Sequence, residues 1–122
     1  AWVLTQAPAA APVVYSSADP AQVTALQTEF GRDRVGHAVE RLMGAVAGQL
    51  RAAGVTRLVV AGGETSGAVV QGLGIKALEI GPEIAPGVPW TRVQGGAPLV
   101  LALKSGNFGG PAFFTDAFGR LR

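Results

Sequence analysis

Hydrophobic and polar positions follow one another along this chain in blocks, first with the spacing of helices and then with that of strands. Apolar residues three and four positions apart predict a helix over residues 20–30, and Asp19 with Pro20 supplies the residues typical of a helix start. The same spacing predicts a longer helix over residues 33–54. Its expected apolar stripe consists of Ala38, Leu42, Val46 and Leu50.

Three glycines, Gly36, Gly44 and Gly48, lie within the longer helix. Each lowers the stability of a helix by roughly 1 kcal/mol relative to alanine. Their presence therefore predicts close packing of this helix against a sheet or a neighbouring helix.

Short apolar runs predict five strands, and two further helices lie among and after them. The expected strands cover residues 12–17, 56–61, 76–80, 90–94 and 98–103, and the expected helices cover residues 66–73 and 111–121. Gly95 and Gly96 separate the last two strands and predict a hairpin. Prolines punctuate residues 81–89 and predict a loop without regular structure.

This order of elements predicts a single domain of the α/β class over residues 1–122. Strands that alternate with helices favour a Rossmann-like three-layer arrangement, with a mixed, mostly parallel sheet and a C-terminal hairpin. Residues 1–12 are rich in alanine and proline and are typical of a linker. Since the chain begins with Ala1 and not with methionine, we expect a fragment of a larger protein.

The composition excludes several kinds of site and partner. The chain has no cysteine and a single histidine, so neither a disulfide framework nor a usual zinc site is expected. Its net charge is only +2, and no run of Lys or Arg alternates with aromatic residues, so we expect no nucleic-acid partner. No segment reaches about 18 uninterrupted apolar residues and no signal-peptide pattern opens the chain, so we expect no membrane partner and a cytoplasmic protein.

The first candidate site is a glycine-rich loop between the strand over residues 56–61 and the helix that follows. The loop consists of Gly62, Gly63, Glu64, Thr65 and Ser66. Its glycines leave backbone N–H groups open at the start of a helix, a geometry that attracts phosphate. It is not a Walker P-loop, because Ala68-Val69 stands where that motif has Lys-Ser/Thr, and it does not match G-x-G-x-x-G. The alternative is an ordinary turn in which Thr65 or Ser66 caps the helix.

Glu64 adds a carboxylate to this loop. It would accept hydrogen bonds from a ribose or hold Mg²⁺ through water. The alternative is a favourable negative charge near a helix N-terminus, with no ligand.

The second candidate site follows the strand over residues 98–103 and consists of Lys104, Ser105, Gly106 and Asn107. Lys104 offers a point charge for a phosphate oxygen, Gly106 allows close approach of the backbone, and Asn107 offers a donor and an acceptor. The alternative is a simple loop into the last helix. Two such loops in one domain predict an anionic ligand, and we expect a nucleotide.

Two neighbouring features allow a ligand interpretation as well as a structural one. Residues 87–90 form either a wall of the ligand cleft or an ordinary rigid turn. The phenylalanines near the end of the chain are expected in the core and not as a stacking platform, with the last two on one helix face. They are Phe108, Phe113, Phe114 and Phe118.

Three ordered segments closely resemble the C-terminal nucleotide-binding domain of the four-carbon acid sugar kinase family, which includes 3-oxo-tetronate and threonate kinases. The segments cover residues 61–68, 80–90 and 101–109, and the resemblance extends from about Val13 to the end of the chain. It implies ATP-dependent phosphorylation of a hydroxyl on an acid of the 3-oxo-tetronate, threonate or erythronate type, with Mg²⁺ offsetting the phosphate charge. The family's ATP contacts correspond here to Gly62, Gly63, Glu64, Thr65, Ser66 and Gly106.

Two parts of the family pattern are missing from this chain. They are the N-terminal domain that binds most of the sugar acid and a serine-rich, ATP-contacting strand end. We therefore name no catalytic residue and no metal ligand, and we expect the fragment alone to be inactive. The expected partners are ATP and a sugar acid. The sequence is also compatible with a homo-oligomer. The alternatives are a non-catalytic binding module for a phosphorylated metabolite and a purely structural domain.

Overall fold

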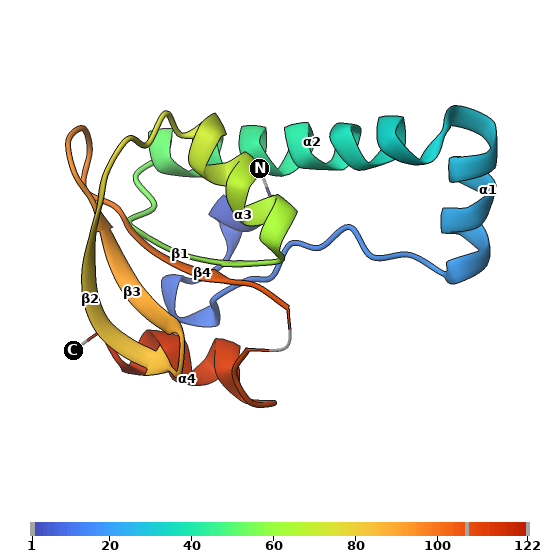
Figure 1. Cartoon of the computed structure of the whole chain (residues 1–122). Helices are drawn as coiled ribbons and strands as arrows, with labels where there is room; N and C mark the ends of the chain where they lie inside the picture. Colours follow the sequence, from blue (N-terminus) through green and yellow to red (C-terminus); the bar gives the residue numbers. More distant parts are fainter. Residues whose placement is uncertain (1, 107, 122) are drawn as a thin grey trace.

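A four-stranded mixed sheet forms the centre of this computed structural model, which describes residues 2–106 and 108–121 (Figure 1). The strands are β1 (Arg57–Ala61), β2 (Leu78–Ala85), β3 (Val88–Val93) and β4 (Val100–Lys104), in the spatial order β1-β4-β3-β2. β1 and β4 are parallel, whereas β4 with β3 and β3 with β2 are antiparallel. The prediction of an α/β class and a mixed sheet is confirmed. The prediction of a mostly parallel sheet is wrong, because the links around β3 are too short for the crossover that parallel strands need.

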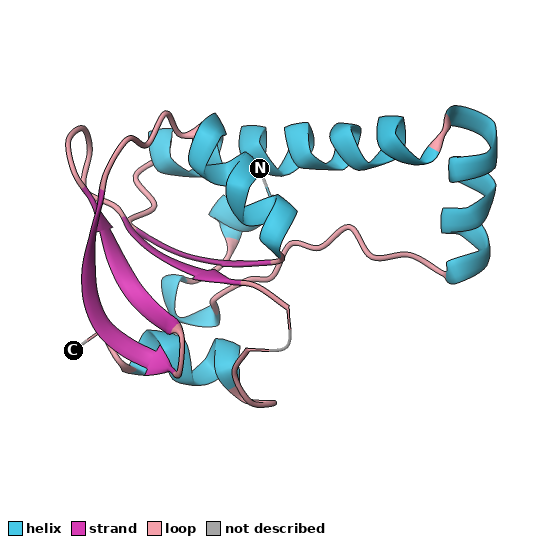
Figure 2. Ribbon diagram, viewed as in Figure 1, coloured by secondary structure: helices cyan, strands magenta, loops and turns pink. Residues whose placement is uncertain are grey.

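Helices cover both faces of this sheet (Figure 2). They are α1 (Pro20–Phe30), α2 (Arg32–Ala52), α3 (Gly63–Gly72) and α4 (Phe113–Gly119), preceded by the 3-10 turns η1 (Trp2–Thr5) and η2 (Pro8–Ala10). α3 packs on one face beneath α2, and α4 packs on the other (Figure 1). α1 and the first half of α2 project from the sheet as an arm, and α1 has no buried residue.

The hydrophobic core consists of two layers that meet at β4. Leu101 faces the α3 side and Ala102 faces the α4 side, and both are fully buried, as expected of an inner strand. On the α4 side, Trp90 is 1% exposed and its indole Nε1–H donates a 2.8 Å hydrogen bond to the carbonyl oxygen of Ala117. This bond satisfies the polar atom of the largest core side chain and fixes α4 against the sheet.

The strand predicted over residues 12–17 is absent. These residues have no regular structure, and Val13 and Tyr15 are 58% and 74% exposed. A lone extended segment gains no stability without a neighbour for its backbone groups. Within the described residues, β1 pairs only with β4, so no strand pairs with the other side of β1.

The loop predicted over residues 81–89 is also wrong, because β2 continues through it to Ala85. β2 is the outermost strand, where a proline without an N–H is tolerated, and its register with β3 shifts on either side of Glu83. Ala85 and Val88 then pair across a two-residue turn, Pro86–Gly87. Gly87 has φ +81°, the conformation required at the third position of a type II turn.

The buried faces of two helices differ from the predicted ones. In α2 the buried residues are Gly44 and Ala47, while Leu42 of the expected stripe is 56% exposed. In α4 the buried residues are Phe113 and Ala117, while Phe114 is exposed. Apolar spacing places residues on common faces, but the position of the neighbouring elements decides which face is covered.

Close contact between α2 and α3 at two glycines explains which face of α2 is buried. A methyl group at Gly44 would lie 3.0 Å from the carbonyl oxygen of Ala68 in α3, and one at Gly72 would lie 3.0 Å from Gly44 Cα. The same group at Gly36 or Gly48 would contact nothing within 4 Å. The predicted close packing is therefore confirmed at Gly44 and wrong at the other two glycines.

Candidate functional site

The two glycine-rich loops lie side by side at the end of the sheet where β1 and β4 finish, which we call the loop edge. β1 and β4 are parallel neighbours, and their last residues, Ala61 and Lys104, are paired. The N–H of Gly62 donates a 2.7 Å hydrogen bond to the carbonyl oxygen of Lys104. The loops are thus joined where both strands end, which is the place where α/β sheets bind ligands.

The N-terminus of α3 opens at this edge. Gly62 occupies the N-cap position with φ +108°, and no side chain caps the helix. The first helical hydrogen bond runs from the N–H of Ser66 to the carbonyl oxygen of Gly62, at 2.9 Å. The N–H groups of Gly63, Glu64 and Thr65 precede this bond and have no intrahelical acceptor. Thr65 and Ser66 lie inside the first turn, so the alternative in which either of them is the N-cap is wrong.

The side chains of this first turn differ in exposure. Glu64 is exposed, whereas Thr65 and Ser66 are half-buried. A methyl group at Gly62 would lie 3.4 Å from Thr65 Oγ1, so this hydroxyl folds back over the cap. Ser66 Oγ is buried without a hydrogen-bond partner among the described residues. A buried hydroxyl normally has a partner, so Ser66 offers an unused donor at the start of the helix.

The second loop folds back on itself next to α3. Lys104 Nζ donates a 2.7 Å hydrogen bond to the carbonyl oxygen of Gly106 and lies 5.9 Å from the centre of the Phe113 ring. Gly106 has φ +53°. A methyl group at Gly63 would lie 3.9 Å from Ser105 Cβ, so this loop directly adjoins the first turn of α3. Asn107 lies outside the described residues.

A third turn, which joins β2 to β3, also lies at the loop edge, on the opposite side of β4 from β1. β3 is antiparallel to β4, so the Pro86–Gly87 turn before β3 lies at the edge where β4 ends. The Gly87 N–H donates a 3.0 Å hydrogen bond to Glu83 Oε1. Of the expected wall over residues 87–90, Val88 and Trp90 are core residues, and only the start of the segment lies at the surface.

Phe108 was assigned wrongly from the sequence, as was Phe114, which is also exposed. Phe108 was expected in the core, but it is 51% exposed and packs against the Pro86–Gly87 turn. Its position directly after the second glycine loop is the sequence signal that distinguishes it from Phe113, which is 3% exposed.

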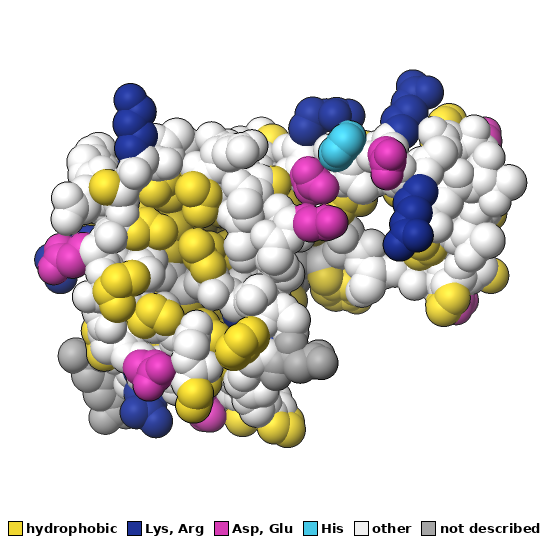
Figure 3. Space-filling model, viewed as in Figure 1, with side chains coloured by type: hydrophobic (Ala, Val, Ile, Leu, Met, Phe, Trp, Pro, Cys, Tyr) yellow, Lys and Arg dark blue, Asp and Glu magenta, His cyan; other side chains and the backbone are white. Residues whose placement is uncertain are grey.

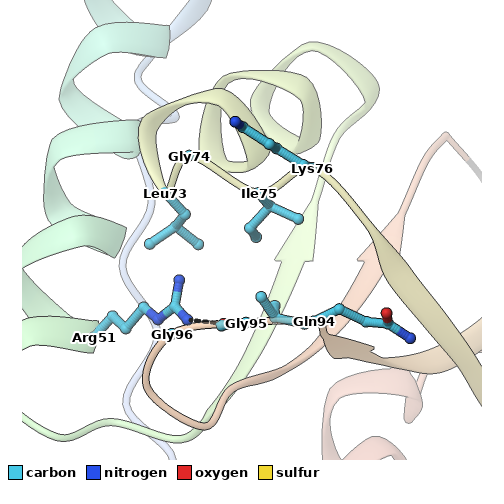
Figure 4. Close-up of a pocket in the computed structure, with 9 residues that line it drawn as sticks. Arg51, Leu73, Gly74, Ile75, Lys76, Gln94, Gly95 and Gly96 are labelled. Atoms are coloured by element: carbon cyan, nitrogen blue, oxygen red, sulfur yellow. Dashed lines mark hydrogen bonds between the residues drawn. The ribbon is translucent and has the colours of Figure 1, made fainter.

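A separate hollow of about 270 Å³ opens at the opposite edge of the sheet (Figure 4). Leu73 and Ile75 line it, and Arg51 Nη2 donates hydrogen bonds to the carbonyl oxygens of Gly95 (3.2 Å) and Ala97 (2.6 Å). This guanidinium therefore fixes the β3–β4 connection. The hollow contains none of the residues predicted for the ligand site.

Charges of both signs alternate on the face shown in Figure 3, mainly over the arm, and they form no continuous basic surface there. Among the described residues, no three His, Cys, Asp or Glu side chains gather in a way that could hold a metal ion. In the same part of the chain, no helix is both long and apolar enough to cross a membrane.

Comparison with known proteins places this arrangement in a family. Residues 1–114 match a family model described as a nucleotide-binding C-terminal domain. A 3-oxo-tetronate kinase from Cupriavidus necator is 56% identical over 109 residues, which cover 89% of this chain and 25% of that protein. Seven further bacterial proteins with the same name are 48–57% identical to this chain over the matched residues.

Solved structures agree with this match. A crystal structure from Salmonella typhimurium LT2, provisionally described as a tRNA synthase, superimposes with a TM-score of 0.89 at 46% identity, covering 99% of this chain and 29% of that one. A Bordetella bronchiseptica protein with bound citrate, described as a domain-swapped dimer, has a TM-score of 0.57 at 30% identity, covering 64% and 20%. This chain spans about a quarter of the length of the curated relatives it matches. Since the family model matches most of its length, the chain belongs to the family of nucleotide-binding C-terminal domains.

Proposed function

We propose that this domain binds the ATP of a kinase that phosphorylates a hydroxyl of a four-carbon acid sugar, of the 3-oxo-tetronate, threonate or erythronate type. The hydrogen bond between Gly62 and Lys104 carries the proposal, because it brings two loops suited to phosphate to one place. The name shared by the curated relatives supports the substrate class. A second, N-terminal domain outside this chain would bind most of the sugar acid, and this domain alone would be inactive.

The residues of the loop edge would act by positioning and by charge. The open N–H groups of Gly63, Glu64 and Thr65 would bind phosphate oxygens, helped by the helix dipole. Ser66 Oγ would donate its unused hydrogen bond, and Lys104 would leave the carbonyl of Gly106 to reach a phosphate. Donors held in place before the reaction stabilise the charge that develops during phosphoryl transfer. We assign no catalytic base within this chain.

Magnesium would reach this site with the ATP phosphates. In kinases Mg²⁺ keeps several waters and is held by phosphate oxygens with only one or two carboxylates. In the described part of the chain, no three His, Cys, Asp or Glu side chains could hold a metal ion together. The residues of the loop edge therefore fit an ion held mainly by phosphate oxygens, and not one held by protein groups alone. Glu64, exposed in the first turn of α3, would hold the ion through a water molecule.

We further propose that residues 1–122 form one domain of a two-domain kinase, with a Rossmann-like three-layer arrangement. The placement of α3 and α4 on opposite faces of the sheet supports the three layers. A homo-oligomer is part of this proposal, supported by the domain-swapped dimer of the Bordetella relative.

The rival function is a binding module that recognises a phosphorylated metabolite and does no chemistry. Incubating the intact protein with ATP, Mg²⁺ and 3-oxo-tetronate, threonate or erythronate separates the two. We expect release of ADP that depends on one of these acids. Binding of ATP without acid-dependent ADP release would favour the binding module, and absence of ATP binding would contradict both the kinase and its ATP site.

Replacing Lys104 by methionine should raise the Kd of the intact protein for ATP by about 10- to 30-fold, because a hydrogen bond to a charged group is lost. Methionine keeps an unbranched apolar side chain next to Phe113, so the fold should persist. The difference between variant and wild type should shrink at high salt, which screens the lysine charge. Lys76→Met is the matched control, since Lys76 is an exposed lysine at the opposite edge. Equal affinities of wild type and Lys104→Met in calorimetry would remove Lys104 from the site.

A further inference from the structure

Phe108 presents an aromatic surface at the loop edge. About half of the residue, 51%, is exposed, although Phe113, five positions further on, is buried. Exposing this much aromatic surface forgoes the stabilisation that burial would provide. The glycine loops supply the proposed phosphate site but no aromatic group of their own.

The Phe108 ring has a rigid support. A methyl group at Gly87 would lie 3.0 Å from Phe108 Cε1 and 3.2 Å from Cδ1, so the ring packs directly against the glycine backbone. Glu83 holds that backbone through the 3.0 Å bond to the Gly87 N–H, and Gly87 has φ +81°. Glycine is thus required here both by the turn and by the ring.

A continuous series of contacts connects this ring to the proposed phosphate position. Ser105 adjoins Gly63 at the start of α3, and the Phe108 N–H donates a 3.4 Å hydrogen bond to the carbonyl oxygen of Ser105. Phe108 follows Lys104 so closely that the chain between them spans at most about 14 Å. Ser105 and Phe108 therefore connect the open N–H groups of α3 with the Pro86–Gly87 turn.

We propose that Phe108 is the surface on which the base of the nucleotide stacks. The phosphates then lie at the start of α3, the base lies over Phe108 beside the Pro86–Gly87 turn, and Ser105 lies along the ligand between them. Bases stack on exposed aromatic side chains because both present flat π surfaces. The inference rests on the proposed ATP site and extends it to the base.

Calorimetry of the intact protein with two ligands, ATP and inorganic tripolyphosphate, tests this assignment. Phe108→Leu keeps an apolar contact with Gly87 but removes the aromatic plane. We expect its Kd for ATP to rise by about tenfold and its Kd for tripolyphosphate to stay unchanged. Phe114→Leu is the matched control, since Phe114 is an exposed phenylalanine on α4, and it should bind both ligands as the wild type does.

Phe108→Trp supplies a direct readout of stacking. The variant should keep its affinity for ATP, and its indole fluorescence should change on addition of ADP but not of pyrophosphate. An equal change with both ligands would indicate a general loop response and overturn the assignment.

The remaining outcomes separate this inference from the proposed function. Unchanged ATP affinity in Phe108→Leu, with tripolyphosphate still bound, overturns the stacking role and leaves the phosphate site standing. Equal weakening of both ligands overturns it too, because Phe108 would then only hold the loop in place. A wild-type protein that binds neither ligand overturns the proposed function and this inference together.

Discussion

Replacing Gly63 by valine should raise the Kd of the intact protein for ATP by at least about a hundredfold, since two or more charge-assisted hydrogen bonds would be lost. Gly63 is the first residue of α3, and a methyl group there would be at ordinary contact distance, 3.9 Å, from Ser105 Cβ. The fold therefore accepts a Cβ at this position. The two further carbons of valine would occupy the space between α3 and the second loop, where the phosphates are proposed to lie. Calorimetry with a non-hydrolysable ATP analogue measures the loss.

Graded variants control for effects on folding. Gly63→Ala adds only a methyl group and should weaken binding much less than valine does. Gly48→Ala, in α2, should leave ATP affinity unchanged, because its methyl group would contact nothing within 4 Å. Gly62 is a poorer choice, because its φ of +108° makes any substitution strained. If Gly63→Val binds ATP normally and unfolds at the wild-type temperature, the phosphates do not lie at the start of α3.

Replacing Gly44 by valine should lower the free energy of unfolding by about 3 kcal/mol or more, at the upper end of the cost of overpacking a core. A methyl group there would meet backbone on the facing helix, with Ala68 O at 3.0 Å and Gly72 Cα at 3.7 Å. Backbone atoms cannot turn aside as a flexible side chain can, so α2 and α3 would have to separate. A domain of this size has only about 5–15 kcal/mol of stability in total, so the loss is large. Urea denaturation of the intact protein, followed through this domain's transition, measures it.

Gly48→Ala is again the matched control, one turn along the same helix. It should raise the stability by about 0.5–1 kcal/mol, because alanine favours the helix and nothing opposes its methyl group. Gly44→Val should also weaken ATP binding, since α3 would carry its N-terminus away from Lys104. If Gly44→Val unfolds at the same urea concentration as the wild type, the close contact between α2 and α3 does not limit stability.

Several features of the loop edge were predictable because they depend on short stretches of chain. Glycines that require positive φ, apolar runs of strand length and the residues of a helix start act over a few positions. The sequence therefore predicted a strand, a glycine turn and a helix in that order, and the structure has β1, Gly62 and α3. The bounds of α1 at Pro20 and Phe30 agree with the prediction for the same reason.

Features that depend on distant parts of the chain were not predictable. Spacing alone favoured Leu42 for the buried face of α2, but α3 approaches where Gly44 and Gly72 allow two backbones to meet. Apolar composition predicted a strand at Val13, which needs a neighbouring strand that it does not have among the described residues. The position of the Phe108 side chain depends on a turn about twenty positions earlier in the chain.

Local chemistry along the chain was sufficient to specify the two glycine-rich loops, because amide geometry at a helix start and glycine conformations are properties of neighbouring residues. Their meeting at one edge, the bond from Gly62 to Lys104 and the ring of Phe108 on Gly87 required the folded sheet. Strand order, and the side on which each helix packs, come from burying apolar surface across the whole domain, and no short segment contains that information.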